Sequence, residues 1–278
     1  MRYEAALEAS RMETDDEKKQ EEALKEVASK LSKIEWNGTS LTISHKAVRT
    51  VGKVTGVKDP YKELKDKFNE RAIEMYPEMK QKVSNSDDPL LTATKLSIAG
   101  NVIDFSPDRD FVVEDVIEET LEKDFAIDHF DQFKEELEKA EDIIYLSDNT
   151  GEIVFDRIFL ETRGGKDVRF FVKSSAILND AMIEDAKFVG IDKIAEIEEV
   201  EDLNNVSEEL KERLRNADLV ISKGQANYEA FSETDANIFF LLMVKCHLIG
   251  DDIGAEEGST IVKWKKKNNP KNPIIVLG

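Results

Sequence analysis

The second half of the chain alternates short runs of β-branched and aromatic residues with stretches of helical periodicity. Strands that alternate with helices of this length predict a mostly parallel sheet with helices on both faces. The predicted strands are residues 143–146, 168–172, 194–196, 219–221 and 274–277. Right-handed crossovers place the strand-to-helix loops at one edge of such a sheet, so residues far apart in sequence become neighbours there.

The first 140 residues have a helical pattern, with apolar side chains recurring every three or four positions. Asp59-Pro60 and Asp88-Pro89 each indicate a helix start. Residues 90–103 form the most apolar predicted helix, and residues 35–42 predict a loop or short hairpin. We therefore expect an α/β protein with a mainly helical domain (residues 1–140) and a three-layer α/β/α domain (residues 141–278). The helical domain is expected to cover the site and to select the leaving group.

The charge balance limits the partners of this chain. Lys and Arg total 39 against 59 Asp and Glu, which gives a formal net charge of −20. This charge disfavours nucleic acid and acidic membranes as partners, and no uncharged stretch of about 18 residues could cross a membrane. The single cysteine, Cys246, excludes an internal disulfide framework and is expected to be a buried, reduced thiol. Since no secretion signal is recognisable, the sequence predicts a cytoplasmic globular protein.

Oxygen-bearing side chains follow two of the predicted strands. Asp148 and Asn149 come directly after the run 143–146, and Asp180 follows the run 168–172. Three oxygen donors without histidine or thiol suit Mg²⁺ or Mn²⁺. The alternative is structural: Asn149 with Glu152 forms a capping-box pattern, and Asp180 could cap a helix that begins near residue 181.

A third loop adds a positive charge to the same predicted edge. Lys223 and Gly224 follow the run 219–221 after a single serine, and Asn227 lies within the next turn. A lysine beside glycine at a strand end fits a phosphate-binding site, and it equally fits a surface turn with a solvated lysine. The chain has no Walker loop and no Gly-x-Gly-x-x-Gly fingerprint. Thr150 replaces the second aspartate of haloacid-dehalogenase phosphatases, which disfavours that family.

Four segments together match the order and spacing of a known family. They are Asp148-Asn149-Thr150-Gly151-Glu152 with its continuation to residue 156, Asn179-Asp180-Ala181, Lys223-Gly224-Gln225-Ala226-Asn227 with its continuation to residue 229, and residues 239–246. These segments resemble the compact archaeal and bacterial branch of the damage-control phosphatases. Compact members usually open with a Cys-x-x-Cys pair, which does not follow Met1 here. Either this sequence begins late relative to its relatives, or this member dispenses with the pair.

The resemblance implies a metal-dependent phosphatase, supported by Mn²⁺, Co²⁺, Ni²⁺ or Mg²⁺, that acts on sugar phosphates or damaged phosphometabolites. It matches Asp148, Asn149 and Asp180 to metal ligands. It matches Glu152 and Asn179 to the substrate pocket, and Lys223, Asn227 and Lys245 to polar positions near the phosphate.

The leading hypothesis is hydrolysis of a small phosphomonoester, with Asp148, Glu152 and Asp180 as catalytic residues. Glu152 is the first choice of general base, because Asp180 would be occupied by metal. One alternative is a methyltransferase that uses S-adenosylmethionine, although only Gly151 stands where a Gly-x-Gly turn would favour it. Another is a non-catalytic protein that binds a metal or a metabolite.

Overall fold

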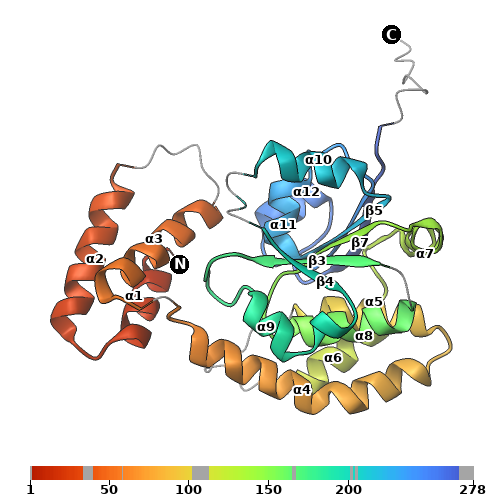
Figure 1. Ribbon diagram of the computed structural model, residues 1–278, viewed down its shortest axis with the longest axis horizontal. Coiled ribbons are helices and arrows are strands. Elements are labelled where there is room, and N and C mark those ends of the chain that lie inside the picture. The colour runs from red at the N-terminus through yellow and green to blue at the C-terminus, as the bar shows by residue number, and fades with distance from the viewer. Residues whose placement is uncertain are drawn as a thin grey trace, which may run out of the picture.

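The computed structural model describes residues 2–33, 40–57, 59–101, 113–164, 167–200, 203 and 206–268. Figure 1 shows a sheet with helices on both faces and a group of three helices beside one end of it. The strands are β1 (Ile127–Asp128), β2 (Ile143–Leu146), β3 (Val168–Lys173), β4 (Glu196–Val200), β5 (Leu219–Lys223), β6 (Ile238–Met243) and β7 (Thr260–Lys265). The helices are α1 (Arg2–Glu13), α2 (Glu17–Leu31), α3 (Ser40–Thr55), α4 (Lys62–Ser84), α5 (Pro89–Gly100), α6 (Val113–Glu122), α7 (Phe130–Lys139), α8 (Glu152–Arg163), α9 (Ile183–Phe188), α10 (Glu208–Asn216), α11 (Gly224–Phe231) and α12 (His247–Ile253), with a short 3-10 helix, η1 (Ile191–Lys193), before β4.

The strands form one sheet in the order β1-β7-β6-β5-β2-β3-β4. Neighbouring strands run parallel except β6 and β7, which are antiparallel. This confirms the predicted α/β fold with a mostly parallel sheet. The chain moves from β2 outward to β3 and β4, and then returns to β5 on the other side of β2. Such a reversal leaves a crevice at the carboxyl ends of the two central strands, where open α/β sheets bind ligands.

Three predicted strands, β2, β3 and β5, lie where the sequence pattern placed them. The predicted run 194–196 overlaps β4 only at Glu196, because residues 191–193 form η1 and Ile194 closes it. The predicted strand at residues 274–277 lies outside the described residues. The pattern did not predict β1, β6 or β7, and the antiparallel pair of β6 and β7 is compatible with the predicted, mostly parallel sheet.

Each face of the sheet carries its own apolar core. On one face, Phe159 of α8 packs against Tyr145, which stacks on Phe170. On the other face, Ile144 and Phe171 belong to a core shared with α10, α11 and α12. Neighbouring residues of β2 therefore point to opposite faces, as the pleat of a strand requires. Figure 1 shows α5, α8 and α9 below the sheet and α10, α11 and α12 above it.

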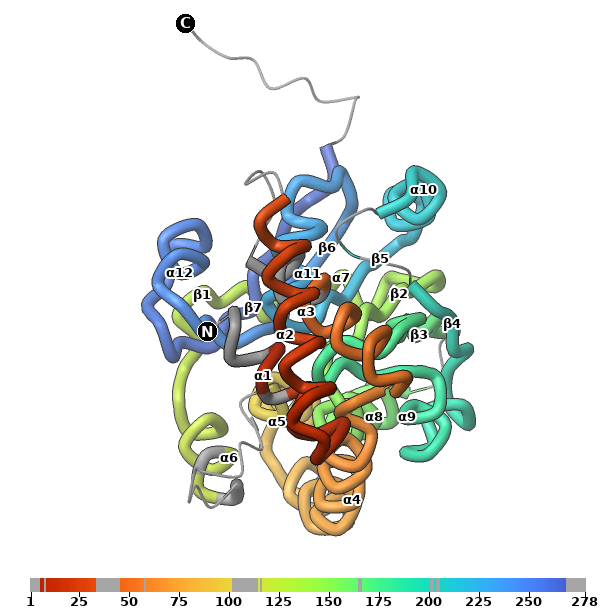
Figure 2. Tube along the Cα trace, turned by 90° about the vertical axis from the view of Figure 1, so that its left-hand side faces the viewer, coloured from red at the N-terminus to blue at the C-terminus, as the bar shows by residue number. Residues whose placement is uncertain are grey.

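Helices α1, α2 and α3 have a separate core, formed mainly by alanine and valine side chains such as Ala23, Val27 and Val51. In Figure 2, which views the left-hand side of Figure 1, these three helices lie in front of the sheet. Leu178, in the loop after β3, also packs on their core and has a φ of 48°. The core of α1–α3 therefore ends near residue 61, and the buried residues that follow belong to the core of the sheet. Strand β1, which lies within the first 140 residues, is also part of the sheet. The boundary at residue 140 stays a prediction.

The predicted helix starts are found with small shifts. Asp88 caps α5 and Pro89 opens it, as predicted, whereas α4 begins at Lys62, after Asp59 has accepted the backbone N–H of Tyr61. Helix α5 ends at Gly100, and residues 102–103 of its predicted range lie outside the described residues. The predicted loop at 35–42 is wrong at residues 40–42, which open α3, and residues 35–39 lie outside the description.

Two further sequence expectations can be compared with the structure. Cys246 is a free thiol but only half-buried, because it lies at the exposed start of α12, so its predicted burial is wrong. Among the described residues, no helix combines the length and the apolar character needed to cross a membrane.

Candidate active site

The loops that follow β2 and β3 are paired with each other through their backbones. The N–H of Thr150 donates to the carbonyl of Asn179 at 2.9 Å, and the N–H of Ala181 donates to the carbonyl of Asp148 at 2.9 Å. Between these two bonds, Asn149 and Asp180 form an antiparallel bridge. The three predicted metal ligands are therefore brought together on two adjoining strand ends.

The loop that follows β5 closes on the same point. Gly224 has a φ of +75°, and a Cβ atom built on it would lie 1.9 Å from Oδ2 of Asp148 and 2.3 Å from its Cγ. Only glycine accepts both that backbone conformation and that approach at low cost. The carboxylate of Asp148 therefore lies against the start of α11, at the crevice between β2 and β5.

The two carboxylates of the predicted metal site have different surroundings. Oδ2 of Asp148 accepts hydrogen bonds from Nδ2 of Asn101 at 2.6 Å and from Nδ2 of Asn149 at 3.0 Å. Among the described residues, no hydrogen bond reaches the side chain of Asp180. Burial, together with the negative charge of Asp148, raises the pKa of Asp180 to about 7, against the opposing effect of Lys173 and Lys65. A cation between the two carboxylates would relieve this repulsion.

Helix capping does not occupy these side chains. The residue before α8 is Gly151, which has no side chain to cap with. Nδ2 of Asn149 donates to Asp148 at 3.0 Å and to Oε2 of Glu152 at 3.5 Å, and the backbone N–H of Asn149 donates to the same Glu152 oxygen at 3.4 Å, which is half of the capping-box pattern. Helix α9 begins at Ile183, and Asp185 accepts the backbone N–H of Met182 at 2.9 Å. Asp180 therefore does not perform the capping role that was its structural alternative.

Glu152, Asp156 and Lys223 form a fully buried ionic cluster behind Asp148. The ammonium of Lys223 donates to Oε1 of Glu152 at 2.6 Å, to Oδ1 of Asp156 at 2.8 Å and to the carbonyl of Ser97 at 3.0 Å. Burial opposes the charge of Lys223, but the two carboxylates raise its pKa. Since an ammonium has three protons, Lys223 has none left for the phosphate contact expected of it.

Glu152 is tied to Asp148 through a shared amide. Nδ2 of Asn101 donates to Oδ2 of Asp148 and, at 2.7 Å, to Oε2 of Glu152. Burial raises the pKa of Glu152 to about 7, and the charges of Asp156 and Asp148 act in the same direction, whereas Lys223 lowers it. Asn101, the residue after α5, was not among the predicted site residues.

The remaining predicted residues fall into different environments. Asn227 is buried and uses its amide to join strand ends: Nδ2 donates to the carbonyls of Ser147 at 2.9 Å and Lys223 at 2.8 Å. Asn179 is half-buried and binds Thr150 through its backbone carbonyl. Lys245 is exposed, and its backbone N–H donates to Gln225 at 3.0 Å. Asn227 therefore shapes the site from within, whereas the side chain of Lys245 extends into solvent.

Two polar residues of α4 support the paired loops from the helical half. Asn69 accepts the N–H of Gly151 at 2.8 Å and donates to Asp185 at 3.0 Å. Lys65, one turn earlier, binds Asp185 at 3.2 Å and Asp59 at 3.0 Å. Lys65 and Asn69 are buried although polar. Their spacing of four places them beside Phe68 and Ala72 on the apolar stripe of α4, which was the sequence signal that could have revealed them.

The donor set fits a hard divalent cation. The set is not one made of His, Cys, Asp and Glu alone, because no group of three or more such side chains is arranged to hold a metal ion in the described part of the chain. The set at the paired loops has two carboxylates and one amide, Asp148, Asp180 and Asn149, and oxygen ligands with water in the remaining positions are typical of Mg²⁺ and Mn²⁺ sites.

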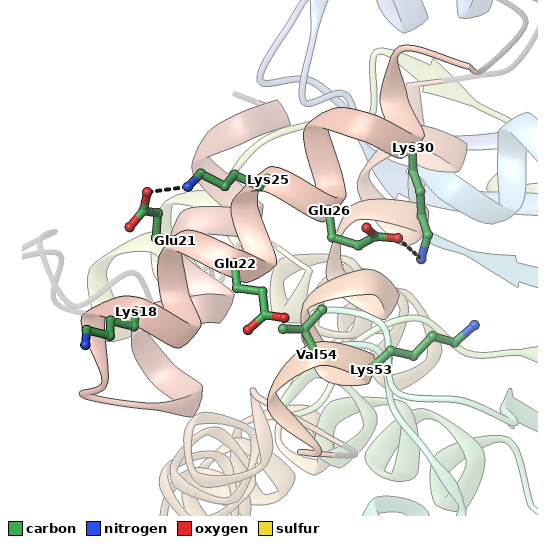
Figure 3. A pocket seen from close by; sticks show the side chains of 8 residues that line it. All are labelled: Lys18, Glu21, Glu22, Lys25, Glu26, Lys30, Lys53 and Val54. Atoms are coloured by element: carbon green, nitrogen blue, oxygen red, sulfur yellow. Dashed lines mark hydrogen bonds and ion pairs between the residues drawn. The ribbon is translucent and has the colours of Figure 1, made fainter.

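A surface hollow of about 540 Å³ lies elsewhere, between α2 and α3 (Figure 3). Its charged residues belong mainly to α2 and pair along that helix, as Lys25 does with Glu21 at 2.5 Å and Lys30 with Glu26 at 3.4 Å. Exposed pairs of this kind are worth little and bind one another rather than a ligand. No residue of the strand ends lines the hollow, so we assign it no role in the chemistry.

The fold and the site together define an α/β protein with an oxygen-ligand set at its topological switch point. A family model described as the damage-control phosphatase ARMT1-like domain matches residues 2–261. A crystal structure of a DUF89 family protein, PH1575 of Pyrococcus horikoshii, is similar with a TM-score of 0.83 at 31% identity, and the match covers 95% of this chain and 96% of that chain.

Relatives of known sequence are similar over most of this chain. A damage-control phosphatase of Archaeoglobus fulgidus is 34% identical over 261 residues, which cover 87% of this chain and 88% of the relative. An uncharacterized protein of Methanocaldococcus jannaschii, MJ0202, is 35% identical over 274 residues, which cover 90% of this chain and 88% of the relative. The chain belongs to the damage-control phosphatase family, which confirms the resemblance seen in its motifs.

Proposed function

We propose that this protein is a metal-dependent phosphatase that hydrolyses small phosphomonoesters, namely sugar phosphates or damaged phosphorylated metabolites. Family membership supports the phosphatase class. The observation that carries the metal dependence is the backbone pairing that joins Asp148-Asn149 to Asp180 and leaves the Asp180 carboxylate without a hydrogen bond among the described residues. We propose the cytoplasm as its location.

Asp148, Asn149 and Asp180 would hold the divalent ion, which could be Mn²⁺, Mg²⁺, Co²⁺ or Ni²⁺. When bound, such an ion supplies positive charge that polarises a phosphoryl oxygen. The chain's own residues position the reaction around that point. Asn101 fixes the Asp148 and Glu152 carboxylates relative to each other through one amide nitrogen. Most of the rate acceleration would come from this fixed arrangement of charge.

Glu152 is the proposed general base, acting through Oε2. Its other oxygen, Oε1, is bound by Lys223 at 2.6 Å, so the side chain cannot rotate freely. Lys223 would then act by holding Glu152 and Asp156 in place, and the polar residues Asn179 and Asn227 by holding the loops. Lys245, whose side chain is exposed, remains a candidate for contact with the substrate.

The helical half is proposed to select the leaving group. A cavity of about 250 Å³ lies between α3 and the loop after β3, lined by residues that include Arg49, Gly52 and Lys53 on one side and Ser175 and Ala176 on the other. Ser175 and Ala176 stand a few residues before Asp180, so this cavity adjoins one of the paired loops. Its basic residues would suit a leaving group that carries negative charge or hydroxyl groups.

The methyl-transfer alternative receives no support from the described residues. At the switch point, where a methyltransferase would present a glycine-rich turn, this chain places the carboxylates of Asp148 and Asp180. The non-catalytic alternative differs from the phosphatase in one measurable property, the release of inorganic phosphate.

The proposed function predicts that Asp148→Ala abolishes metal-dependent release of phosphate, because the substitution removes a ligand at the centre of the site. The measurement is phosphate released from an aryl phosphate and from a panel of sugar phosphates, with and without Mn²⁺. Asp142→Asn, an exposed change at the opposite end of β2, is the matched control and should retain activity. Undiminished turnover by Asp148→Ala would refute the assignment, and silence of the unaltered protein across the panel would favour the binding protein.

A further inference from the structure

Lys173, the last residue of β3, is a buried lysine with unused hydrogen-bonding capacity. Its side chain is 3% exposed, and its ammonium donates to Oδ1 of Asn227 at 2.9 Å. Among the described residues no other hydrogen bond of this ammonium is found. An ammonium carries three donors, and burying a charge with donors unfilled is costly. A ligand that accepts two hydrogen bonds would complete this group.

The other buried lysines differ in this respect. Lys223 places all three of its protons on protein oxygens, two of them on the carboxylates of Glu152 and Asp156. Lys65 is paired with the carboxylates of Asp59 and Asp185. Of the lysines that the structure shows as buried, only Lys173 has a neutral hydrogen-bond partner and no carboxylate in direct contact.

The backbone places Lys173 beside the proposed metal ligands. Its N–H donates to the carbonyl of Ala181 at 2.9 Å, next to Asp180. Its partner Asn227 is bound in turn to the carbonyls of Ser147 and Lys223, at the ends of the two central strands. The positive charge of Lys173 also lowers the pKa of Asp180 against the larger, opposite effect of burial.

The pleat of the sheet puts Lys173 and Lys223 on opposite faces. Phe171, two residues before Lys173, belongs to the core beneath α10, α11 and α12. Ile221, two residues before Lys223, belongs to the core between the sheet and helices α5 and α8. Residues two apart in a strand share a face, so the two lysines approach the strand ends from opposite sides. Within the part of the chain that the structure describes, the ammonium of Lys223 is saturated by protein oxygens and that of Lys173 is not.

We propose that Lys173 contacts the phosphoryl group of the substrate, with its two unused protons donated to phosphate oxygens. This inference rests on the proposed phosphatase function and assigns to Lys173 the phosphate contact that the motif pattern assigned to Lys223. The contact exists in the substrate complex and strengthens as negative charge builds on the phosphoryl oxygens, so Lys173 is a catalytic residue. Asn227 holds the ammonium in place.

The test uses inorganic phosphate as the probe, titrated calorimetrically into the full chain with saturating Mn²⁺. Lys173→Met removes the charge, Lys173→Gln removes it but keeps a donor for Asn227, and Lys173→Arg keeps it. We expect Met and Gln to weaken phosphate binding about 10- to 100-fold, as for a lost hydrogen bond to a charged group. Arg should restore part of the affinity. Lys139→Met, an exposed change of the same charge on α7, should bind as the unaltered protein does.

Titration of Mn²⁺ without phosphate separates contact from support. A phosphate contact predicts that Mn²⁺ affinity is unchanged or tighter in Lys173→Met, because a positive charge near the carboxylates has gone. Equal loss of Mn²⁺ and phosphate affinity, or full recovery by Lys173→Gln, would overturn the proposal in favour of a supporting role through Asn227. If Lys173→Met does not fold, the Gln and Arg pair decides by the same comparison.

Failure of the proposed function has a different signature. An unaltered protein that neither hydrolyses phosphomonoesters nor binds phosphate would overturn the phosphatase and, with it, this role of Lys173. An unaltered protein that does both, beside a Lys173→Met variant that binds phosphate within about twofold of it, would overturn the role of Lys173 alone.

Discussion

At the scale of single residues, the site depends on contacts too close for ordinary side chains. Asp148 can lie against the start of α11 only because residue 224 has no Cβ. The same carboxylate receives two amide hydrogen bonds, from Asn101 and Asn149, which fix its orientation. One residue thus joins the ends of α5, β2 and β5, and small displacements of its carboxylate should be costly for a charge-positioning reaction.

Gly224→Ala should therefore lower phosphatase activity by roughly 100-fold, because the new methyl group would displace the Asp148 carboxylate. The measurement is kcat/KM for an aryl phosphate, together with the dissociation constant of Mn²⁺. The control is Gly254→Ala, since Gly254 has a φ of +85° with no atom within 4 Å of an added Cβ and so shares the backbone cost without the clash. Equal activity of the two variants would contradict the close approach at Asp148.

At the scale of secondary-structure elements, α4 connects the helical half to the catalytic loops. Lys65 and Asn69, one turn apart, reach Asp185 near the start of α9 and the N–H of Gly151 before α8. The two loops that carry the proposed metal ligands are thus held by one helix. A buried network of this kind is rigid when every member is paired and costly when one partner is removed.

Asn69→Leu should destabilise the fold by roughly 1–3 kcal/mol for each of the two buried groups it leaves unpaired, Gly151 N–H and Asp185 Oδ1. It should also weaken Mn²⁺ binding, because the loop that carries Asp148 and Asn149 loses its fixed end. Urea unfolding and a metal titration measure the two effects. Gln81→Leu, exposed on the same helix, serves as the control. Metal affinity that stays the same in a destabilised Asn69→Leu would limit α4 to a structural role.

At the scale of the whole molecule, α1–α3 form a unit that touches the catalytic loops through few points. Leu178 joins its core just before Asn179 and Asp180, and α3 faces Ser175 and Ala176 across a cavity. Within this unit, Glu13 at the end of α1 accepts a hydrogen bond from Thr55 of α3, and its Oε1 is buried without a partner among the described residues. The stability of the unit should therefore depend on the protonation of Glu13.

Burial raises the pKa of Glu13 from 4.5 to about 7. Between these two values the folded chain binds more protons than the unfolded chain. The free energy of unfolding therefore falls as the pH rises from about 4.5 to 7, and the contribution of Glu13 no longer changes at higher pH. Melting temperatures of Glu13→Gln minus those of the unaltered protein should grow from pH 5 to pH 7 and level off by pH 8. Glu22→Gln, exposed on α2, is the matched control for the loss of one carboxylate. A flat difference for Glu13→Gln would show that its carboxyl is not perturbed.

The sequence alone determined the α/β class, the central strands and the meeting of Asp148, Asn149 and Asp180, because these follow from local signals. Strand periodicity and the polar residue after each strand can be read from a few neighbours, and the parallel topology places such residues at one edge. The ends of β4 and the presence of β6 were not predicted, because short apolar runs have no distinctive period. Strand β1 has only 2 residues, and β7 carries two lysines, Lys263 and Lys265, so neither shows a clear strand pattern.

Only the tertiary structure decided which polar groups are already satisfied. Lys223 and Lys173 both follow the same pattern, a lysine at the end of a parallel strand. The first is saturated by Glu152, Asp156 and Ser97, whereas the second has one hydrogen bond from its ammonium among the described residues. Ser97 stands 126 positions from Lys223, and Asn69 stands 82 positions from Gly151. Hydrogen-bond saturation depends on such distant partners, and no local pattern of residues specifies them.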